Sequence, residues 1–309
     1  MANTLNKNDV KLLEIIAEHR FLTVEQATWI AQKPKRCVYR RVQRLITEGF
    51  LSQANKDIGQ DFGRPKTLIE LTDSGVDILI DKGLLSPTIS YENVTAANIH
   101  CPGHQMLMNW FRIYFKYAEK VIPAVRTHFL AHTSPFLPHD PAGRAIIADK
   151  APALDNYNSP DIRFVPDGVM SITDTTRDKT ILLFLEVDCG TETLASPKRD
   201  MTDVRQKIVN YTSYFLSERY KRYEKLWNCK LRGFHLLFLT NTEGRHRSLC
   251  RLAQEMVPEN TCFVYLTDQN QLFRRGATAE IWAKAGNITG LQTSIFGSLC
   301  CPGPLPRQS

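Results

Sequence analysis

The chain has 309 residues, of which 43% are hydrophobic and 23% charged, a composition that supports packed cores and excludes wholesale disorder. No uninterrupted apolar run approaches the roughly 20 residues that span a bilayer, and the N-terminal MANTLNKNDV lacks a signal-peptide layout, so we expect no membrane insertion. The eight cysteines form no C-x-x-C pair and have no His at zinc spacing, which favours a reducing cytoplasm. A net charge of +7 admits a polyanionic partner without demanding one.

The N-terminal region predicts three helices followed by two strands. Asn8 or Asp9 is expected to cap the first helix. Thr23, with Gln26 three residues later, predicts a capping box at the start of a short second helix. The third helix is expected to end at Gly49 in a left-handed cap, before strands at 50–54 and 66–71.

The third helix is strongly basic, with six basic and no acidic residues between positions 33 and 44. The order of elements, with VYRRVQRLITEGFL and IELTDSG, resembles a winged helix-turn-helix, which places its third helix in the DNA major groove and wing cations on phosphates. A solvated basic face, or a dimerisation or protein-docking module, is the alternative interpretation. The DNA-binding candidates are Lys35, Arg36, Arg40, Arg41 and Arg44 in the helix, and Lys56, Arg64 and Lys66 in the wing.

The remainder of the chain alternates between helical and strand patterns. Residues 104–120 have helical spacing, and 131–160 contain repeated turn signals that predict an irregular insertion. Strands are expected at 121–130, 161–172, 180–188, 234–240 and 262–266, and helices at 198–227 and 245–256. We therefore divide the chain into a DNA-binding domain at 1–83, a linker at 84–103, a second domain at 104–290 and a tail at 291–309.

Acidic residues gather at the ends of two predicted strands, within PDGVMSITDTTRDKTILLFLEVDCGTE. In a hairpin, Asp167 on one strand and Glu186 and Asp188 on the next can face the same side. Carboxylates this close raise each other's pKa unless a metal ion or a base neutralises them. Taken alone, the string is equally compatible with a solvent-facing acidic strand end.

The order of elements around these carboxylates resembles the PD-(D/E)xK nuclease fold, which makes the expected class α+β. In such enzymes an Asp and a Glu bind a divalent ion, and a lysine two residues after the Glu helps to activate water. Asp188 occupies that lysine position here. Either the lysine has moved to the following helix, at Lys207, or the site is degraded and non-catalytic.

The whole chain is similar to the replication-relaxation family of plasmid proteins. The resemblance rests on the winged helix, on HQMLMN opening a helix, and on PDG followed by LEVDCGTE and a lysine-tyrosine helix, and it extends from about residue 8 to 267. Related C-class mobilisation relaxases nick one strand at a plasmid transfer origin. The resemblance implies that Asp167, Glu186 and Asp188 are catalytic acids that bind Mg²⁺ or Mn²⁺, with Lys207 as their charge-stabilising partner and Glu192 as an additional ligand.

The same resemblance implies a function and partners. The chain would be a site- and strand-specific DNA endonuclease in the bacterial cytoplasm, acting on plasmid double-stranded DNA. Its partners would be relaxosome accessory proteins and a coupling protein, and a homodimer is possible. Two other functions compete: a non-catalytic DNA-binding accessory or regulator, and a defence nuclease. Tyr211 and Tyr214 could capture a 5′ phosphate covalently, although such tyrosines usually pack against the sheet. The basic bias of 198–232 suits either a DNA backbone track or a solvated helix.

Overall fold

The computed structural model describes residues 5–54, 67–139, 144–152, 161–195, 203–300 and 303–306. The chain forms two compact units. Unit 1 comprises residues 1–113, 133–137 and 306–309, and unit 2 comprises 114–132 and 138–305. The boundary between them falls inside helix α5 (Pro102–Val121). Helices and sheets occur in both units, which confirms the expected mixed α+β class.

Unit 1 is a small helical unit with a three-stranded antiparallel sheet of order β1-β3-β2. Its elements are α1 (Lys7–His19), β1 (Leu22–Thr23), α2 (Val24–Ala31), α3 (Lys35–Thr47), β2 (Leu51–Gln53), β3 (Leu68–Leu71) and α4 (Asp73–Asp81). The capping box of Thr23 and Gln26 is confirmed, as is Gly49 at a φ of 82° after α3. The expected cap of α1 is wrong by two or three residues: Asn6 caps it, and the Asp9 carboxylate accepts the reciprocal hydrogen bond from the Asn6 N–H.

The segment expected to be a linker lies within unit 1. It contains a short 3-10 turn, Tyr91–Asn93, and Val94 is fully buried in the unit's hydrophobic core. The Arg20 guanidinium donates to the carbonyl oxygens of Glu92, Asn93 and Thr95. These hydrogen bonds tie the segment to the end of α1.

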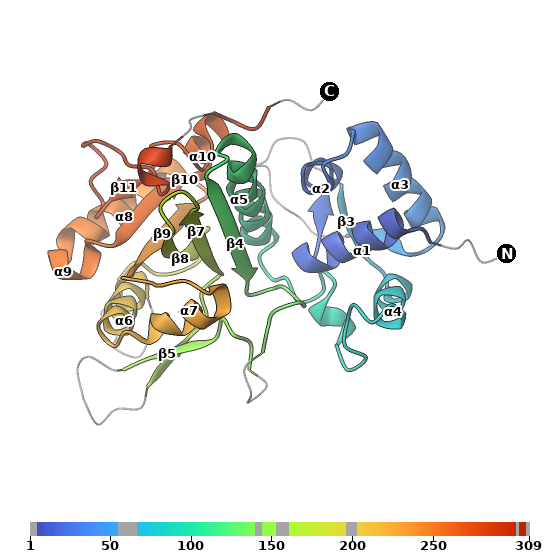
Figure 1. Cartoon of the computed structure of the whole chain (residues 1–309), viewed down its shortest axis with the longest axis horizontal. Coiled ribbons are helices and arrows are strands. Elements are labelled where there is room, and N and C mark those ends of the chain that lie inside the picture. The colour runs from blue at the N-terminus through green and yellow to red at the C-terminus, as the bar shows by residue number, and fades with distance from the viewer. Residues whose placement is uncertain are drawn as a thin grey trace. The chain divides into compact units, whose positions relative to one another are not determined.

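Unit 2 is built on one mixed sheet (Figure 1). Its strand order is β11 (Ala283–Lys284), β10 (Val264–Asp268), β9 (Phe234–Thr240), β8 (Lys179–Asp188), β7 (Gly168–Asp174), β4 (Val125–Ala131). Strands β8, β9 and β10 run parallel to one another, whereas β7 is antiparallel to both β4 and β8. The continuous apolar runs of β8 and β9 are buried, as is typical of strands covered on both faces.

Three expectations for unit 2 are corrected. The single strand expected at 161–172 is two strands, β6 (Ile162–Phe164) and β7, because Pro166 between them has no N–H for a ladder hydrogen bond. The expected irregular insertion contains β5 (Asp149–Ala151), which pairs with β6 in a separate ribbon. The long helix expected at 198–227 breaks after α6 (Val204–Leu216), where Glu218 adopts a positive φ of 55°; 198–202 lie outside the described residues.

An aromatic cluster joins α6 to the sheet. Tyr211 and Tyr214 of α6 pack on Phe184 of β8 and on Phe234 of β9, with ring centroids 5.4 to 6.1 Å apart. Helix α7 (Arg222–Trp227) follows, and α8 (Glu243–Glu255) packs on β9 and β10. The packing of the two tyrosines on the sheet fixes the start of α6 beside the end of β8.

Within the described ranges, no helix has the length and apolar character needed to cross a membrane.

Candidate functional site

Asp167 and Glu186 meet at one edge of the sheet. Strand β7 starts one residue after Asp167, and the register pairs Gly168 with Leu185, so Asp167 stands next to Glu186 across the two strands. The Asp167 Oδ2 accepts a hydrogen bond from the Val187 N–H at 2.7 Å. Burial raises the pKa of Glu186 to about 7; attraction to Lys207 opposes the rise and repulsion from Asp167 adds to it. Glu186 is therefore a buried carboxyl that titrates near neutrality.

Lys207 lies at the centre of the carboxylates. Its Nζ is 3.0 Å from Glu186 Oε2 and 2.9 Å from Glu192 Oε1, and its side chain is 21% exposed. Burial alone would lower the pKa of Lys207, but the attraction of Glu186 and Glu192 outweighs burial and raises it. The ammonium consequently stays charged across the physiological range of pH. The structure thus places a lysine on α6 against Glu186, two residues before the end of β8.

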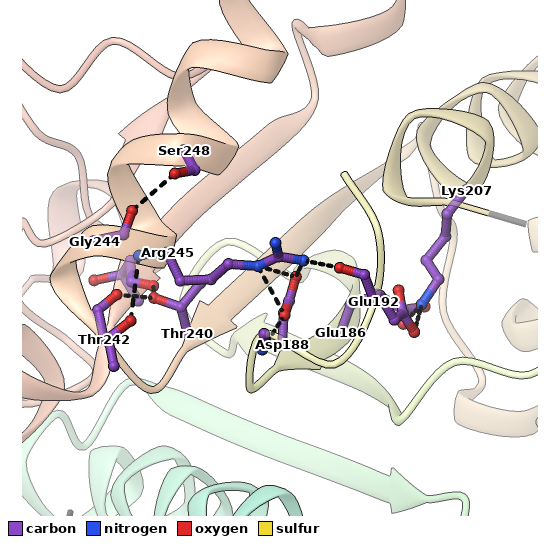
Figure 2. Close-up of polar contacts among 11 residues, drawn as sticks. Glu186, Asp188, Glu192, Lys207, Thr240, Thr242, Gly244, Arg245 and Ser248 are labelled. Carbon is purple, nitrogen blue, oxygen red and sulfur yellow. Dashed lines mark hydrogen bonds and ion pairs between the residues drawn. The ribbon is translucent and has the colours of Figure 1, made fainter. Parts of the chain in front are cut away.

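Asp188 is held by an arginine that the sequence did not single out. Arg245 Nε lies 3.0 Å from both carboxylate oxygens of Asp188, and its Nη2 lies 2.7 Å from Oδ2. The same Nη2 donates to the carbonyl oxygen of Glu192 at 2.6 Å. Figure 2 shows Arg245 reaching Asp188 and Glu192 from one side, and Lys207 reaching Glu186 and Glu192 from the other. The loop that carries Glu192 is therefore fixed between two cations.

Sequence reasoning missed two residues of this site, Arg245 and His132. Arg245 lies in the first turn of α8, which Thr242 caps, and parallel pairing of β8 with β9 brings that turn beside Asp188. His132 follows β4; its backbone N–H donates to the Asp167 carbonyl at 3.0 Å, and its Nδ1 lies 3.5 Å from Asp167 Oδ1. No local sequence motif identifies His132. For Arg245 the only signal in the sequence was its position at the start of a helix that follows a buried strand.

The two tyrosines of α6 are buried. Tyr211 is 1% exposed and donates to Glu186 Oε1 at 2.6 Å, and burial raises its pKa well above the usual value. Tyr214 is fully buried and donates to Asp149. Both hydroxyls are thus turned into the protein, and both rings pack on the sheet.

The four carboxylates differ in their capacity to hold a metal ion. Both oxygens of Asp188 are engaged by Arg245, and Glu192 is engaged by Lys207. Among the residues that the structure describes, no group of three or more His, Cys, Asp or Glu side chains is arranged around a metal position. Asp167 and Glu186 are engaged as well, by the Val187 N–H and by Lys207 and Tyr211, but they lie side by side at the sheet edge. Mg²⁺ is commonly held by one or two carboxylates together with substrate phosphates. These two carboxylates fit that mode of binding.

The cations of helix α3 in unit 1 are all at least partly exposed, and two of them also pair with an acid. Lys35, Arg36 and Arg40 are exposed, on the side of the helix that also carries the 52% exposed Tyr39. Arg41 and Arg44, in contrast, both pair with the carboxylate of Asp9, which is fully buried. The wing candidates Lys56, Arg64 and Lys66 lie outside the described residues.

The model of the replication-relaxation family matches residues 13–228, more than two thirds of the chain. The chain belongs to the replication-relaxation family. Asp167, Glu186, Asp188, Glu192 and Lys207 all lie within the matched range, whereas Arg245 lies beyond it. Membership of the replication-relaxation family indicates a role in DNA replication or relaxation. A search of curated proteins finds no match.

Proposed function

We propose that this chain is a divalent-metal-dependent DNA endonuclease that nicks one strand at a plasmid transfer origin and so initiates conjugative mobilisation. The observation that carries the proposal is the ion pair of Lys207 with Glu186, beside Asp167 at the same sheet edge. It supplies two carboxylates and an ammonium, the groups that the PD-(D/E)xK resemblance requires. The lysine comes from α6 instead of β8.

Asp167 and Glu186 would hold Mg²⁺ or Mn²⁺. Such an ion lowers the pKa of water and offsets charge on a phosphodiester. The charge of Lys207 favours the ionised form of Glu186 against the effect of burial, and its ammonium would offset charge on the scissile phosphate. The Val187 N–H orients the Asp167 carboxylate through Oδ2, and His132 holds the Asp167 backbone through its carbonyl oxygen. The chemistry is thus divided between carboxylates that bind and donors that fix their positions.

Asp188 and Glu192, expected from the sequence to be ligands, have a different proposed role. The three hydrogen bonds from Arg245 to Asp188 fix the end of β8, and the hydrogen bond from Arg245 to the Glu192 carbonyl fixes the following loop. Glu192 in turn accepts a hydrogen bond from the Lys207 ammonium and orients it. We propose that Asp188 and Glu192 position Arg245 and Lys207.

Unit 1 would recognise the DNA duplex as a winged helix-turn-helix. The exposed cations of α3, Lys35, Arg36 and Arg40, are the proposed contacts with the groove and the backbone. Relaxosome accessory proteins and a coupling protein are the proposed partners at the origin. A homodimer on repeated half-sites is compatible with this arrangement.

The nicking assay tests the proposal. Supercoiled plasmid carrying its own origin is incubated with Mg²⁺ or Mn²⁺, and we expect open circles cut at one position. Asp167→Asn should abolish the cut. Asp178→Asn is the matched control, because Asp178 is exposed at the far turn of the β7–β8 hairpin and Asn tolerates its positive φ of 48°.

A non-catalytic DNA-binding regulator is the second candidate, favoured by one observation. Glu186, Asp188 and Glu192 already have protein cations as partners, as in a site that needs no ion. A regulator would retard origin DNA in a gel and leave it supercoiled. Degradation of DNA lacking the origin would instead favour a defence nuclease. Either result would exclude the relaxase proposal.

A further inference from the structure

A basic groove of about 600 Å³ lies in unit 2 beside the β5–β6 ribbon. The residues that carry its charge come from the segment before β5, from both strands of the ribbon, from the 3-10 turn Arg219–Lys221 and from the start of α7. They are Arg144, Lys150, Arg163, Arg219 and Arg222. None of these residues belongs to the carboxylate site or to α3.

The two strands of the ribbon place like charges opposite each other. The antiparallel register pairs Lys150 directly with Arg163. Like charges in this position destabilise a two-stranded ribbon, because their Cβ atoms are only about 5 Å apart. A chain selected for stability alone has no reason to keep such a pair. A bound anion would remove the repulsion.

Two acidic residues of the described part of the chain lie beside these cations. Asp149 lines it, and its carboxylate accepts from the Tyr214 hydroxyl and lies 3.2 Å from Arg222 Nη1. Asp161 pairs with Arg219 at 2.8 Å. Among the described residues, five cations and the Asp149 carboxylate line the groove, and both Asp149 and Asp161 are engaged by arginines. This concentration of positive charge suits a ligand with more than one phosphate.

The groove also has an apolar wall. Phe164 and Val165 line it, and Val165 is 54% exposed, although it is a branched apolar residue next to a strand. Sites for single-stranded nucleic acid combine a cationic track for the backbone with aromatic or apolar surface for bases and sugars. A duplex hides its bases in the stack and would leave this wall without a partner. The combination favours a single strand.

Two connections link the groove to the carboxylate site. The ring of Phe164 packs on Tyr211, 5.0 Å between centroids, and the Tyr211 hydroxyl donates to Glu186. Along the chain, Val165 precedes Asp167 by two residues, a separation of at most about 7 Å between Cα atoms. A strand of DNA at the carboxylates needs to extend by only about one nucleotide to reach the groove.

We propose that this groove binds the sugar-phosphate backbone and a base of single-stranded DNA next to the scissile phosphate. This inference rests on the proposed nuclease function and deepens it, since it names the groove that holds the strand being cut. Lys150 and Arg163 bind the phosphates, and Phe164 and Val165 contact the base and sugar.

The test measures DNA binding without cleavage. A fluorescent oligothymidylate of about 15 nucleotides is titrated with the full chain in the presence of EDTA, and the Kd is read from anisotropy at about 50 and about 200 mM salt. For the double variant Lys150→Ala with Arg163→Ala, we expect the Kd to rise about tenfold and the salt slope to fall by about 1.4, since each lost single-strand phosphate contact removes about 0.7. Val165→Glu should weaken binding independently.

The matched control removes two cations at the turn between β7 and β8, the end of this hairpin opposite Asp167. Arg177→Ala with Lys179→Ala should change the Kd by less than about twofold, because both residues are exposed and distant from the groove. Equal weakening by both double variants, or none by the groove variant, would overturn the inference. Loss of thermal stability in the groove variant would also count against it, since removing a repulsive pair should raise the midpoint. Tight binding of single-stranded DNA that depends on the groove, in a protein that does not nick plasmid, would contradict the nuclease proposal and leave the groove inference standing.

Discussion

The Lys207 Nζ lies 3.0 Å from Glu186 Oε2, so an ammonium reaches the carboxylate at the end of β8 from helix α6 and not from β8 itself. The position two residues after Glu186 is filled by Asp188, and Asp188 is in turn neutralised by Arg245. The β8 position that would carry a lysine thus carries an acid with its own cation. Lys207 and Arg245 therefore neutralise different carboxylates, Glu186 and Asp188.

Lys207→Ala should reduce nicking by about a hundredfold or more, because the variant loses the positive charge nearest to Glu186. The rate of open-circle formation from supercoiled plasmid is the measurement. Lys225→Ala serves as the control, since Lys225 is an exposed lysine on α7. If Lys207→Ala nicks at the parental rate, the lysine of α6 has no catalytic part.

The stability of the folded chain should fall as pH rises through the range in which Glu186 ionises. Its pKa is about 7 in the folded chain against 4.5 without burial, so the folded state holds the proton more tightly. Stability from this group is therefore present at low pH and is lost between these two values as pH rises. Thermal midpoints from about pH 5 to about pH 8 should decline more steeply for the parent than for Glu186→Gln.

A bound divalent ion should counter that decline. At about pH 8, Mg²⁺ is expected to raise the thermal midpoint of the parent, because it binds the folded carboxylate and not the unfolded one. The midpoint of Glu186→Gln should stay unchanged on the same addition. An equal response of both proteins would show that the ion does not bind at Glu186.

Arg245→Ala should lower the free energy of unfolding by about 3–5 kcal/mol, because it leaves the buried Asp188 carboxylate without its cation. Asp188→Asn with Arg245→Ala should recover part of the loss. Denaturation by urea measures both. The two single changes and the double change form a cycle, and purely additive effects would contradict the coupling that the geometry predicts.

Arg40 and Arg44 should respond differently although they lie one turn apart on α3. Arg40→Ala is expected to weaken binding to duplex DNA with little change in stability, because Arg40 is exposed. Arg44→Ala should cost about 1 kcal/mol of stability, since Arg44 pairs with the buried Asp9. Anisotropy with duplex DNA and thermal melting separate the two effects; an unaltered duplex affinity in Arg40→Ala would argue against the groove contact.

Tyr211 should form no covalent bond with DNA, because its hydroxyl is buried against Glu186 and its pKa is raised. End-labelled DNA nicked by the parent should migrate without attached protein on a denaturing gel. Tyr211→Phe should retain nicking at a reduced rate. A labelled protein band in the parent that disappears in Tyr211→Phe would establish covalent capture instead.

Local patterns were sufficient for much of the fold. The capping box at Thr23 and the glycine that follows α3 depend on residues a few positions apart, and both were confirmed. The buried strands β8 and β9 were predicted from their apolar runs alone. The sequence did not predict β5, because β5 is a strand only through its pairing with β6, and the turn signals between the two strands do not indicate that pairing.

The acidic string itself, and its position at the end of a strand, were determined by the sequence. Glu186 and Asp188 are two residues apart, and the alternation of a strand places such residues on the same face. Only the tertiary structure decided how they are neutralised. Lys207 lies 21 residues after Glu186 and Arg245 lies 57 residues after Asp188, and each cation reaches its acid because helix packing and parallel strand pairing bring distant segments together.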